Sequence, residues 1–556
     1  NHKKIEEKIY KYWEKNNSLK NKKNKSKKYF SIVIPPPNVT GSLHMGHALN
    51  NSIQDLLVRH NRNKGLETLW QPGTDHAGIA TQLVVEKQLN EKGFSRKDLG
   101  REKFLKEVWK WKEKSGGIIT DQLKKLGSSC DWSRDRFTMD DGLSKAVLKV
   151  FVNLYEKKLI YKDFKLTNWD TKLQTAISDL EVVQKETKGK LYYIKYKLVD
   201  SDQNIIIATT RPETMFGDTA IAVNPKDERY KNLITKEVII PISNRRIKII
   251  SDEYADPDQG SGAVKITPGH DFNDYLVGKR NNLNLINILN KDGTLNENVP
   301  KDYIHIDRID ARKKLIVELE QKNFLDKIED INHTVPYGDR TNSVIEPLLT
   351  EQWFVNAKKL SHEAIRQVKK KNTNFFPDNW KKTYFQWMEN IEPWCISRQL
   401  WWGHQIPAWY TEDGKIIVAE NFKEAKKIAK KKFKKEVLLK QDPDVLDTWF
   451  SSALWPFATL GWPNNKSYEL KRFYKTKVLV TGFDIIFFWV ARMMMMGLYF
   501  MKEVPFQNVY VHALVRDEKG QKMSKSKGNV IDPLIIINEF GADALRFTLI
   551  SMSSPG

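Results

Sequence analysis

The stretch that decides the fold is YFSIVIPPPNVTGSLHMGH, which runs from Tyr29 to His47. Its first six residues are mostly aromatic or β-branched and end at three prolines, a pattern that predicts a buried strand. From Gly41 to Arg62 the apolar residues recur with helical spacing, so we expect a helix there. A strand, a Gly/Pro loop and a helix in this order open a nucleotide-binding α/β unit.

Two histidines, His44 and His47, stand at the expected start of this helix. A spacing of three puts both rings on one face, where free N–H groups and the positive end of the helix dipole attract phosphate. Gly46 between them leaves room for a flat base close to the backbone. A His pair alone is more often an ordinary surface or core feature. The flanking prolines and Thr40-Gly41 favour a nucleotide site.

A second segment, KMSKSKG at residues 522–528, lies near the other end of the chain. Lys522 and Lys525 are flexible cations that can stabilise the charge developing on departing pyrophosphate. The alternative is a solvated surface loop, but the segment follows a predicted strand at Val509–Leu514. We interpret the two segments as two sides of one nucleotide site, so the intervening chain must fold back.

The strand, turn and helix order of the first stretch returns in the last part of the chain, with a further helix expected at Ile5–Asn16. The two parts predict an α/β fold with a doubly wound, Rossmann-type parallel sheet. The elements expected in the later part are a strand at Lys477–Val480, a turn at 481–483, a helix at Asp484–Met501, the strand at Val509–Leu514, and helices at Pro533–Glu539 and Ala542–Ser551.

The character changes between Leu191 and Val335, where short β-like runs are punctuated by Gly and Pro. This pattern predicts a β-rich domain inserted into the sheet domain. A chain of 556 residues is also too long for a single core. The predicted organisation is a first half of the Rossmann domain at 1–190, the insertion at 191–335, a second half with the lysine-rich loop at 336–530, and the start of a helical junction at 531–556.

The chain is strongly basic, with 92 Lys and Arg against 69 Asp and Glu, a formal net charge of +23. Such a field can concentrate a polyanion such as RNA. The runs of lysine, for example Lys426–Lys435, can equally be solvated helix faces. Charge alone therefore leaves nucleic-acid binding open.

Only two cysteines, Cys130 and Cys395, are present. They cannot form a four-thiolate metal site or a disulfide framework, so we expect no structural zinc and a reducing compartment. The N-terminus lacks the apolar core of a signal peptide, and the apolar run Ile485–Met501 carries Arg492 in its middle. That run is best interpreted as a buried helix. A cytoplasmic protein with no membrane contact is expected.

At this point the motifs resemble a known family. HMGH at 44–47 and KMSKS at 522–526 are similar to the two signature motifs of the class I aminoacyl-tRNA synthetases. The segments PPPNVTG at 35–41, GTDHAGIATQ at 73–82, DTWFSS at 447–452 and GFDIIFFW at 482–489 resemble the valine-activating members, in family order from Ile5 to Gly556. The resemblance implies a monomeric ligase that uses ATP with Mg²⁺ to form valyl-adenylate and then charges tRNA(Val).

The resemblance also implies roles for individual residues. No protein nucleophile is needed, because the amino-acid carboxylate attacks the phosphate and catalysis is positioning plus charge stabilisation. Phosphate contacts are expected from His44, His47, Lys522 and Lys525; ATP contacts from Thr40, Gly46, Asn50, Gly482, Asp484, His512 and Lys525; and valine contacts from Pro36, Asn38, Asp75, Trp449, Ile485 and Trp489.

A carboxylate is needed for the substrate ammonium, and Asp75 matches the family residue with that role, with Asn38 as its helper. A branched aliphatic side chain needs a small, rigid apolar pocket, which the resemblance builds from Pro36, Trp449, Ile485 and Trp489. Most of the 17 Trp are expected to be ordinary core residues. For the two in this set we favour the role in the pocket.

A pocket that fits valine rejects threonine poorly, because an apolar site discriminates weakly against an isostere that adds a hydroxyl. A second, hydrolytic site is the remedy, and TTRPET at 209–214 and KITPGHDFND at 265–274 resemble the segments that form it. Asp271 and Asp274 are expected to bind the ammonium and hydroxyl and orient water, although HDFND alone could be a helix N-cap. The residues expected to grip the tRNA end are Thr209, Thr210, Arg211, Thr214, Lys265 and Thr267.

Three alternatives were weighed against this interpretation. The isoleucine and leucine enzymes share the signatures and the insertion, but are expected to differ at Pro37-Asn38 and at 74–77. A small-molecule nucleotidylyltransferase can share the His-x-Gly-His turn, yet has no reason to carry the insertion. A non-catalytic RNA-binding relative would be expected to lose Lys525 or a signature histidine, and all are present.

Two departures from the family pattern stand out. The segment Pro336–Ser343 lacks the Cys pair that many relatives carry, so a zinc knuckle is not expected. Gln259 stands where an aromatic residue is expected, which leaves the shape of the hydrolytic pocket open. The chain starts without Met and ends at Gly556, so we expect a piece of a longer protein that charges tRNA poorly without an anticodon-binding domain.

Overall fold

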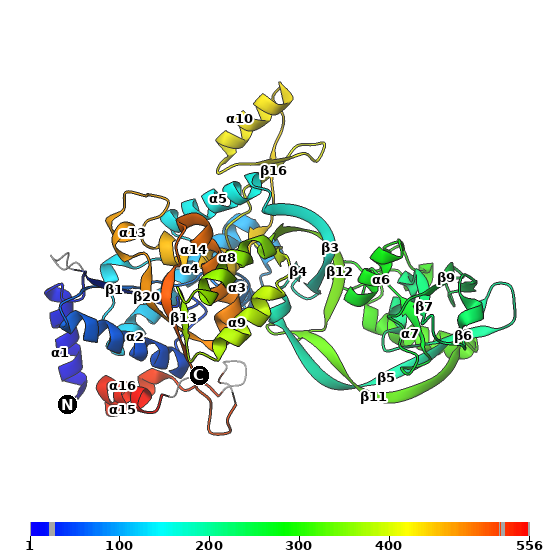
Figure 1. Cartoon of the computed structure of the whole chain (residues 1–556), viewed down its shortest axis with the longest axis horizontal. Helices are drawn as coiled ribbons and strands as arrows, with labels where there is room; N and C mark the ends of the chain where they lie inside the picture. The colour runs from blue at the N-terminus through cyan, green and yellow to red at the C-terminus, as the bar shows by residue number, and fades with distance from the viewer. Residues whose placement is uncertain (1, 22–27, 522, 524–528, 554–556) are drawn as a thin grey trace. The chain divides into compact units, whose positions relative to one another are not determined.

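The computed structural model describes residues 2–21, 28–521, 523 and 529–553. They form two compact units, one made of Asn1–Tyr161 with Trp353–Gly556 and the other of Lys162–Gln352 (Figure 1). We refer to these as the first and the second unit. The chain leaves the first unit on β3 (Ile160–Asp170) and returns on β12 (Ile345–Val355).

The centre of the first unit is built from parallel strands contributed by distant parts of the chain. β1 (Tyr29–Val33) pairs in parallel with β2 (Glu67–Gln71). β21 (Phe506–His512) pairs in parallel with both β20 (Thr476–Gly482) and β13 (Asn374–Phe376). β1 and β20 lie side by side, so the two half-sheets meet. The α/β fold predicted from the sequence is confirmed, and β1 and β20 occur where strands were expected.

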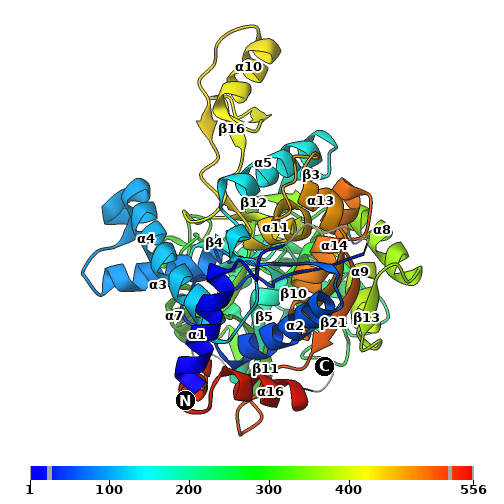
Figure 2. The same cartoon turned by 90° about the vertical axis from the view of Figure 1, so that its left-hand side faces the viewer.

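Helices cover this sheet, and α2 lies beside β20. On another side α2 lies beside α16 (Figure 2). The helix expected at Gly41–Arg62 begins four residues later, after the Gly/Pro loop, while α16 has the predicted bounds. The helices of the first unit are α1 (His2–Lys15), α2 (Met45–Asn63), α3 (Gly78–Asn90), α4 (Arg96–Lys125), α5 (Asp141–Glu156), α8 (Ala357–Lys369), α9 (Trp380–Glu389), α10 (Phe422–Phe433), α11 (Thr448–Ser452), α12 (Trp455–Ala458), α13 (Tyr468–Phe473), α14 (Arg492–Met501), α15 (Pro533–Phe540) and α16 (Ala542–Ser551).

The helix expected at Asp484–Met501 forms in three parts. A 3-10 turn at Phe483–Ile485 is followed by a π-helical segment at Ile486–Ala491 and then by α14. By length and composition alone, Phe483–Met501 is the one helix among the described residues that could cross a membrane, and most of it is buried in the protein. Arg492 lies inside this helix and pairs with the buried Asp447 at 3.2 Å. The segment therefore packs as a core helix, as the sequence predicted.

Short strands complete the first unit. β14 (Trp394–Cys395) pairs with the end of β12, and β15 (Ser397–Arg398) pairs with β19 (Val445–Leu446). A small sheet of β16 (Ala408–Tyr410), β17 (Ile416–Val418) and β18 (Lys440–Gln441) packs with α10 around Trp409 and Ala425. The lysines of α10 thus share a helix with a buried apolar face.

The second unit is a β-rich body with a long antiparallel ribbon. Its seven-stranded sheet has the order β10-β7-β9-β8-β5-β11, with β6 paired to β5. The strands are β5 (Val182–Leu198), β6 (Asn204–Thr209), β7 (Ala220–Val223), β8 (Glu237–Ile239), β9 (Arg246–Ser251), β10 (Ala263–Ile266) and β11 (Leu325–Gly338); β4 (Thr175–Ala176) pairs with β3, and the helices are α6 (Phe272–Arg280) and α7 (Arg308–Gln321).

The predicted insertion, 191–335, lies inside the second unit, which is longer at both ends. The reason is the ribbon: β5 and β11 stay paired from Ile194 opposite Leu325 to Val182 opposite Gly338. Alternating exposed residues along the ribbon gave no strong strand pattern, so the sequence placed the boundary where the apolar runs begin.

Candidate functional site

The two histidines of the first motif cap helix α2 reciprocally. The Gly46 backbone N–H donates to His44 Nδ1 at 3.0 Å, and the His44 backbone N–H donates to His47 Nδ1 at 3.2 Å. The ring centroids are 4.0 Å apart. An Nδ1 that accepts a hydrogen bond carries no proton, so each neutral ring holds its proton on Nε2. The helix start therefore combines its own N–H groups with two imidazole donors.

Gly46 is required by this cap. A Cβ at this position would lie 2.8 Å from His44 Cε1, closer than a Cβ approaches other atoms in proteins, and 3.0 Å from His44 Nδ1. The space above the Gly46 backbone is thus occupied by the His44 ring. Any larger residue would push the ring off the helix start.

Asn50 joins helix α2 to the carboxyl ends of β20 and β21. Its Nδ2 donates to the Val480 carbonyl at 3.3 Å and to His512 Nε2 at 2.9 Å. His512 Nδ1 in turn donates to the Ala513 carbonyl at 2.9 Å, and burial lowers the pKa of His512, so the ring is neutral. In doubly wound sheets this edge is where nucleotides bind.

The remaining residues expected around ATP lie at the end of β20 and in the loop before α2. Gly482 ends β20, and a Cβ there would lie 2.7 Å from Oδ1 of the exposed Asp484. Thr40 is half-buried in the loop before α2, and its N–H donates to the Asn38 carbonyl at 2.7 Å.

The lysine motif is only partly described. Lys522 and Lys525 lie outside the described residues. Met523 between them is buried in an apolar cluster that also contains Met45, the residue beside His44. The two signature segments, far apart in sequence, therefore contribute to one apolar cluster.

Asp75 is held beside the first motif by backbone pairing. The Asp75 N–H donates to the Pro37 carbonyl at 2.9 Å, and the Val39 N–H donates to the Asp75 carbonyl at 3.0 Å, which forms a bridge between Asn38 and Asp75. Asp75 is buried, with 4% of the residue exposed, whereas Asn38 is exposed. The carboxylate expected to bind an ammonium thus lies one loop away from the capped helix start.

The Asp75 carboxylate is fixed at both oxygens. Oδ1 accepts from the Ala77 N–H at 2.7 Å, and Oδ2 accepts from Ser452 Oγ at 2.5 Å. Burial raises the pKa of Asp75 to about 6, although both hydrogen bonds act in the opposite direction. At neutral pH the group is still mostly charged. Ser452 was not among the predicted site residues, because nothing local in the sequence links it to Asp75.

Asp75 lacks a cationic partner among the described residues. The one basic group within 4.0 Å is the His76 ring, whose Nδ1 lies 3.7 Å from Oδ1. Burial lowers the pKa of His76 to about 3, so this ring is neutral. A buried charge is costly unless it is paired. An ammonium group from a ligand would supply the missing charge.

Two of the residues expected to line the apolar pocket, Trp489 and Trp449, lie close to Ser452. Trp489 is 1% exposed, and its Nε1 donates to the Ser452 carbonyl at 3.1 Å. Trp449, on the same short helix as Ser452, is half-buried and stacks on Phe488 with centroids 5.2 Å apart. Pro36 and Ile485 are half-buried. Helix α11 thus connects both indoles to the Asp75 carboxylate through Ser452.

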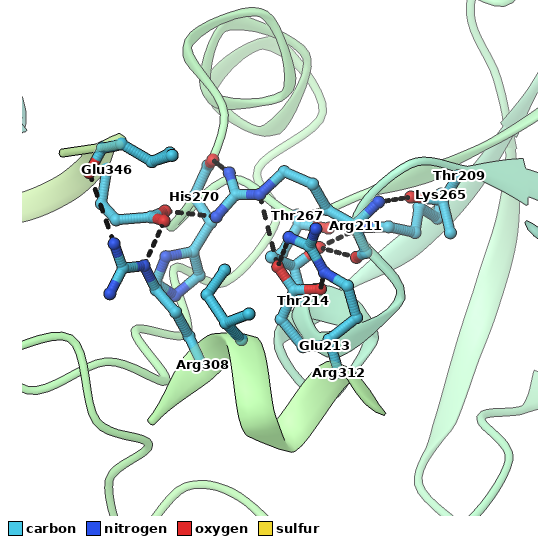
Figure 3. Close-up of polar contacts among 12 residues, drawn as sticks. Thr209, Arg211, Glu213, Thr214, Lys265, Thr267, His270, Arg308, Arg312 and Glu346 are labelled. Carbon is cyan, nitrogen blue, oxygen red and sulfur yellow. Dashed lines mark hydrogen bonds and ion pairs between the residues drawn. The ribbon is translucent and has the colours of Figure 1, made fainter. Parts of the chain in front are cut away.

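In the second unit, Lys265 is the centre of a buried polar cluster (Figure 3). Its Nζ donates to Thr267 Oγ1 at 2.5 Å and to Thr214 Oγ1 at 2.7 Å, and lies 3.2 Å from Asp218 Oδ1. Thr267 Oγ1 also donates to Asp218 at 2.7 Å. These partners satisfy all three ammonium donors. The structure therefore uses Lys265 to hold the two motifs together.

Asp271 and Asp274 occupy the start of helix α6. Asp271 Oδ1 accepts from the N–H groups of Asn273 and Asp274, so it is the N-cap that the sequence left open as an alternative. Asp274 Oδ2 accepts from the Thr267 N–H at 2.8 Å. Burial, and next the charge of Asp271, raise the pKa of Asp274 to about 7. One buried carboxyl therefore titrates near neutral pH beside a charged one.

Arg211 of the first motif contacts the second motif. Its Nη1 donates to the His270 carbonyl at 3.1 Å, its Nη2 pairs with Glu346, and its Nε lies 3.5 Å from Glu213 Oε1. Burial alone would lower the pKa of Arg211, but the two carboxylates raise it above its ordinary value. The Arg211 N–H donates to Thr209 Oγ1 at 3.0 Å, while Thr210 is half-buried. Neither Glu346 nor Glu213 was predicted as a site residue.

No metal cluster is evident in the part of the chain that the structure describes, where no group of three or more His, Cys, Asp or Glu could hold an ion. The Pro336–Ser343 segment instead forms hydroxyl contacts to Asp170, with Thr341 Oγ1 donating to Oδ2 at 2.5 Å.

Comparison with known proteins identifies the class. Residues 8–556 match the family model described as tRNA synthetases class I (I, L, M and V), so the chain belongs to the class I aminoacyl-tRNA synthetases. It is 68% identical over 555 residues to the valine--tRNA ligase of Pelagibacter ubique (strain HTCC1062), which covers 100% of this chain and 63% of that protein. It is 59% identical over 569 residues to the valine--tRNA ligase of Rhodopseudomonas palustris (strain ATCC BAA-98 / CGA009), covering 95% of this chain and 59% of that protein.

The chain thus spans about three fifths of the length of these curated relatives. Among solved structures, the ternary complex of Agrobacterium radiobacter K84 agnB2 LeuRS with tRNA and LeuAMS matches with a TM-score of 0.54 and 19% identity, covering 99% of this chain and 72% of that one. At this identity the likeness shows the fold alone. The family resemblance of the sequence motifs is confirmed.

Proposed function

We propose that this chain activates valine with ATP, transfers it to tRNA(Val), and hydrolyses mischarged threonyl-tRNA in its second unit. The observation that carries the proposal is the buried Asp75 carboxylate, which lacks a described cationic partner and adjoins the capped start of α2. The identity to valine--tRNA ligases along the whole chain supports valine as the amino acid.

In this mechanism the valine ammonium pairs with Asp75, and the valine carboxylate points toward the α-phosphate of ATP. A carboxylate oxygen forms a bond to the α-phosphorus as the bond to pyrophosphate breaks. The α2 N-terminus with the His44 and His47 Nε2–H groups stabilises the phosphate charge. Magnesium would enter bound to the phosphates of ATP, and Lys522 and Lys525 are proposed to neutralise the leaving pyrophosphate.

Side-chain selection is assigned to the wall around α11. Trp449 and Trp489 are large and rigid, and Trp489 is fixed by its bond to the Ser452 carbonyl. Together with Pro36 and Ile485 they would bound a small apolar pocket that an extra methylene overfills. Because Ser452, which holds Asp75, lies on the same helix α11 as Trp449, side-chain fit and ammonium binding would both depend on one short element.

Threonine would pass this wall, and its removal is assigned to the start of α6. Asp274, with a pKa near 7, is suited to activate water for attack on the ester carbon, and the ester oxygen of the terminal ribose leaves with a proton. Asp271 would bind the threonyl ammonium or hydroxyl. Thr209, Thr210 and Arg211 are proposed to grip the terminal nucleotide, with Thr214, Lys265 and Thr267 holding them in place.

The decisive assay is amino-acid-dependent exchange of pyrophosphate into ATP. We expect valine to drive the exchange far better than isoleucine or leucine, with measurable exchange by threonine. Exchange driven best by isoleucine or leucine would overturn the valine proposal. We further propose a soluble, cytoplasmic monomer, which light scattering coupled to gel filtration would check.

A further inference from the structure

Glu346 lies between two arginines of the second unit (Figure 3). Its Oε1 accepts from Arg308 Nε at 2.6 Å, and its Oε2 pairs with Arg211 Nη2. The residue is 2% exposed and stands on β12, outside both motifs assigned to hydrolysis. A buried carboxylate shared by two guanidinium groups has little freedom, because each partner fixes one of its oxygens.

Arg211 connects this carboxylate to the hydrolytic motif. Its Nη1 donates to the carbonyl of His270, the residue directly before the N-cap Asp271. Asp271 orients the first turn of α6, which carries Asp274. A continuous set of contacts therefore leads from Glu346 through Arg211 to the start of α6.

A second buried carboxylate holds the other edge of Arg211. Glu213 accepts from Arg312 Nε at 2.6 Å and from Arg312 Nη2 at 2.7 Å, and lies 3.5 Å from Arg211 Nε. Arg312 follows Arg308 by four residues on α7, so both face the same side of that helix. The guanidinium plane of Arg211 is thus fixed between Glu346 and Glu213, which a lysine could not reproduce.

We propose that Glu346 is a positioning residue for the hydrolysis of threonyl-tRNA: it holds Arg211 on the His270 carbonyl and thereby sets the place of Asp271 and Asp274. The inference rests on the proposed function of the second unit. Glu346 acts through Arg211 and needs no contact with the substrate. Without its charge, Arg211 and Arg308 lose their shared acceptor, and their like charges turn Arg211 away from His270.

The test is Glu346→Gln in the full chain, assayed with threonyl-tRNA(Val) charged beforehand. We expect the maximal hydrolysis rate to fall at least tenfold, while valine-dependent pyrophosphate exchange stays within twofold of the unchanged chain. Glu351→Gln is the matched control: it lies on the same strand, pairs with Lys162 at 2.8 Å and is 59% exposed at the side chain. It should hydrolyse normally. A rate within twofold of the unchanged chain for Glu346→Gln overturns the proposal.

Action through Arg211 is tested by a double-mutant cycle. If Glu346 works by holding Arg211, then Arg211→Gln with Glu346→Gln hydrolyses no more slowly than Arg211→Gln alone. Losses that multiply in the double variant would mean an independent, merely structural effect and would overturn the positioning role.

Hydrogen exchange supplies a readout besides activity. Backbone amides of residues 268–276 should exchange hydrogen faster in Glu346→Gln than in the unchanged chain, whereas their exchange rate in Glu351→Gln should not change. Equal exchange rates in the two variants overturn the proposal. If Glu346→Gln unfolds the second unit, Glu346→Asp decides, because it keeps the charge but is one methylene too short to reach both arginines. Partial loss of hydrolysis with an unchanged melting curve supports the proposal, and full activity overturns it.

A different set of results would show that the second unit does not hydrolyse threonyl-tRNA at all. A chain that leaves threonyl-tRNA intact, or that hydrolyses it equally well as Asp274→Ala, contradicts the hydrolytic assignment itself. If Asp274→Ala loses hydrolysis of threonyl-tRNA as expected but Glu346→Gln keeps full activity, only the positioning role of Glu346 is contradicted.

Discussion

Ser452 donates a hydrogen bond to the Asp75 carboxylate across 377 residues of sequence, at 2.5 Å. The bond places one end of α11 against the loop that follows β2. The position of the Asp75 carboxylate is therefore fixed by the same short helix that carries Trp449.

Ser452→Ala should therefore weaken valine binding. Losing a hydrogen bond to a charged group costs about 1.5–3 kcal/mol, so we expect the KM for valine to rise roughly tenfold or more with the KM for ATP unchanged. Pyrophosphate exchange measures both. Ser451→Ala is the control, because the Ser451 Oγ donates to the Thr448 carbonyl of its own helix at 3.0 Å. An equal rise in both variants would contradict the specific role of Ser452.

The pKa of Asp75, raised to about 6, predicts a pH dependence. Valine binding requires the charged carboxylate, so the KM for valine should rise about tenfold per pH unit below pH 6 and stay constant above pH 7. In the absence of valine, the folding stability of the chain should change with pH in the opposite direction. Because the folded pKa lies above the unfolded value, protonation favours the folded chain, and the contribution of Asp75 to the free energy of unfolding increases as pH falls from 7 toward 4.

Pyrophosphate-exchange kinetics from pH 5 to 8 test the pH dependence of the KM for valine. Melting curves of the valine-free chain over the same range test the pH dependence of its stability. Asp75→Asn serves as the control, since it removes the titrating group. A pH profile that is the same in Asp75→Asn and the unchanged chain would assign the dependence to another residue.

Gly46→Ala should damage ATP binding through the helix cap. The new Cβ would lie 2.8 Å from the His44 ring, so the ring must leave the start of α2. We expect the KM for ATP to rise about tenfold, which corresponds to roughly 1.4 kcal/mol of lost binding. Gly116→Ala in α4 meets no atom within 4 Å and should instead raise the melting temperature. Comparable KM values in both variants would contradict the cap as the cause.

Asp274→Ala should leave valine activation intact and let threonyl-tRNA accumulate, because we assign the two reactions to different units. In the unchanged chain, hydrolysis should increase as pH rises through about 7, the value to which burial and Asp271 raise the pKa of Asp274. Hydrolysis of threonyl-tRNA between pH 6 and 8.5 measures this. A flat profile would assign the base to another group.

Local patterns predicted much of the fold. β1, β20 and α16 follow from apolar periodicity and turn residues that lie within a few positions of one another. The candidate site is different, since the contacts of Ser452 to Asp75 and of Glu346 to Arg211 join residues far apart in the sequence, and no local pattern encodes them. The π-helical segment before Arg492 was also not predicted, because its apolar residues have the same spacing as those of an ordinary buried helix.

The ribbon of β5 and β11 brings the two ends of the rest of the second unit next to each other. Gly189 and Ile331 face one another in its ladder, so the residues between them depart from and return to adjoining points of the chain. Cross-strand neighbours lie only about 5 Å apart. A turn of a few residues is thus long enough to join Gly189 to Ile331 in place of the residues between them. We expect that the part of the second unit beyond this step can be removed or exchanged as one segment while the paired residues from Val182 to Gly189 and from Ile331 to Gly338 stay in register.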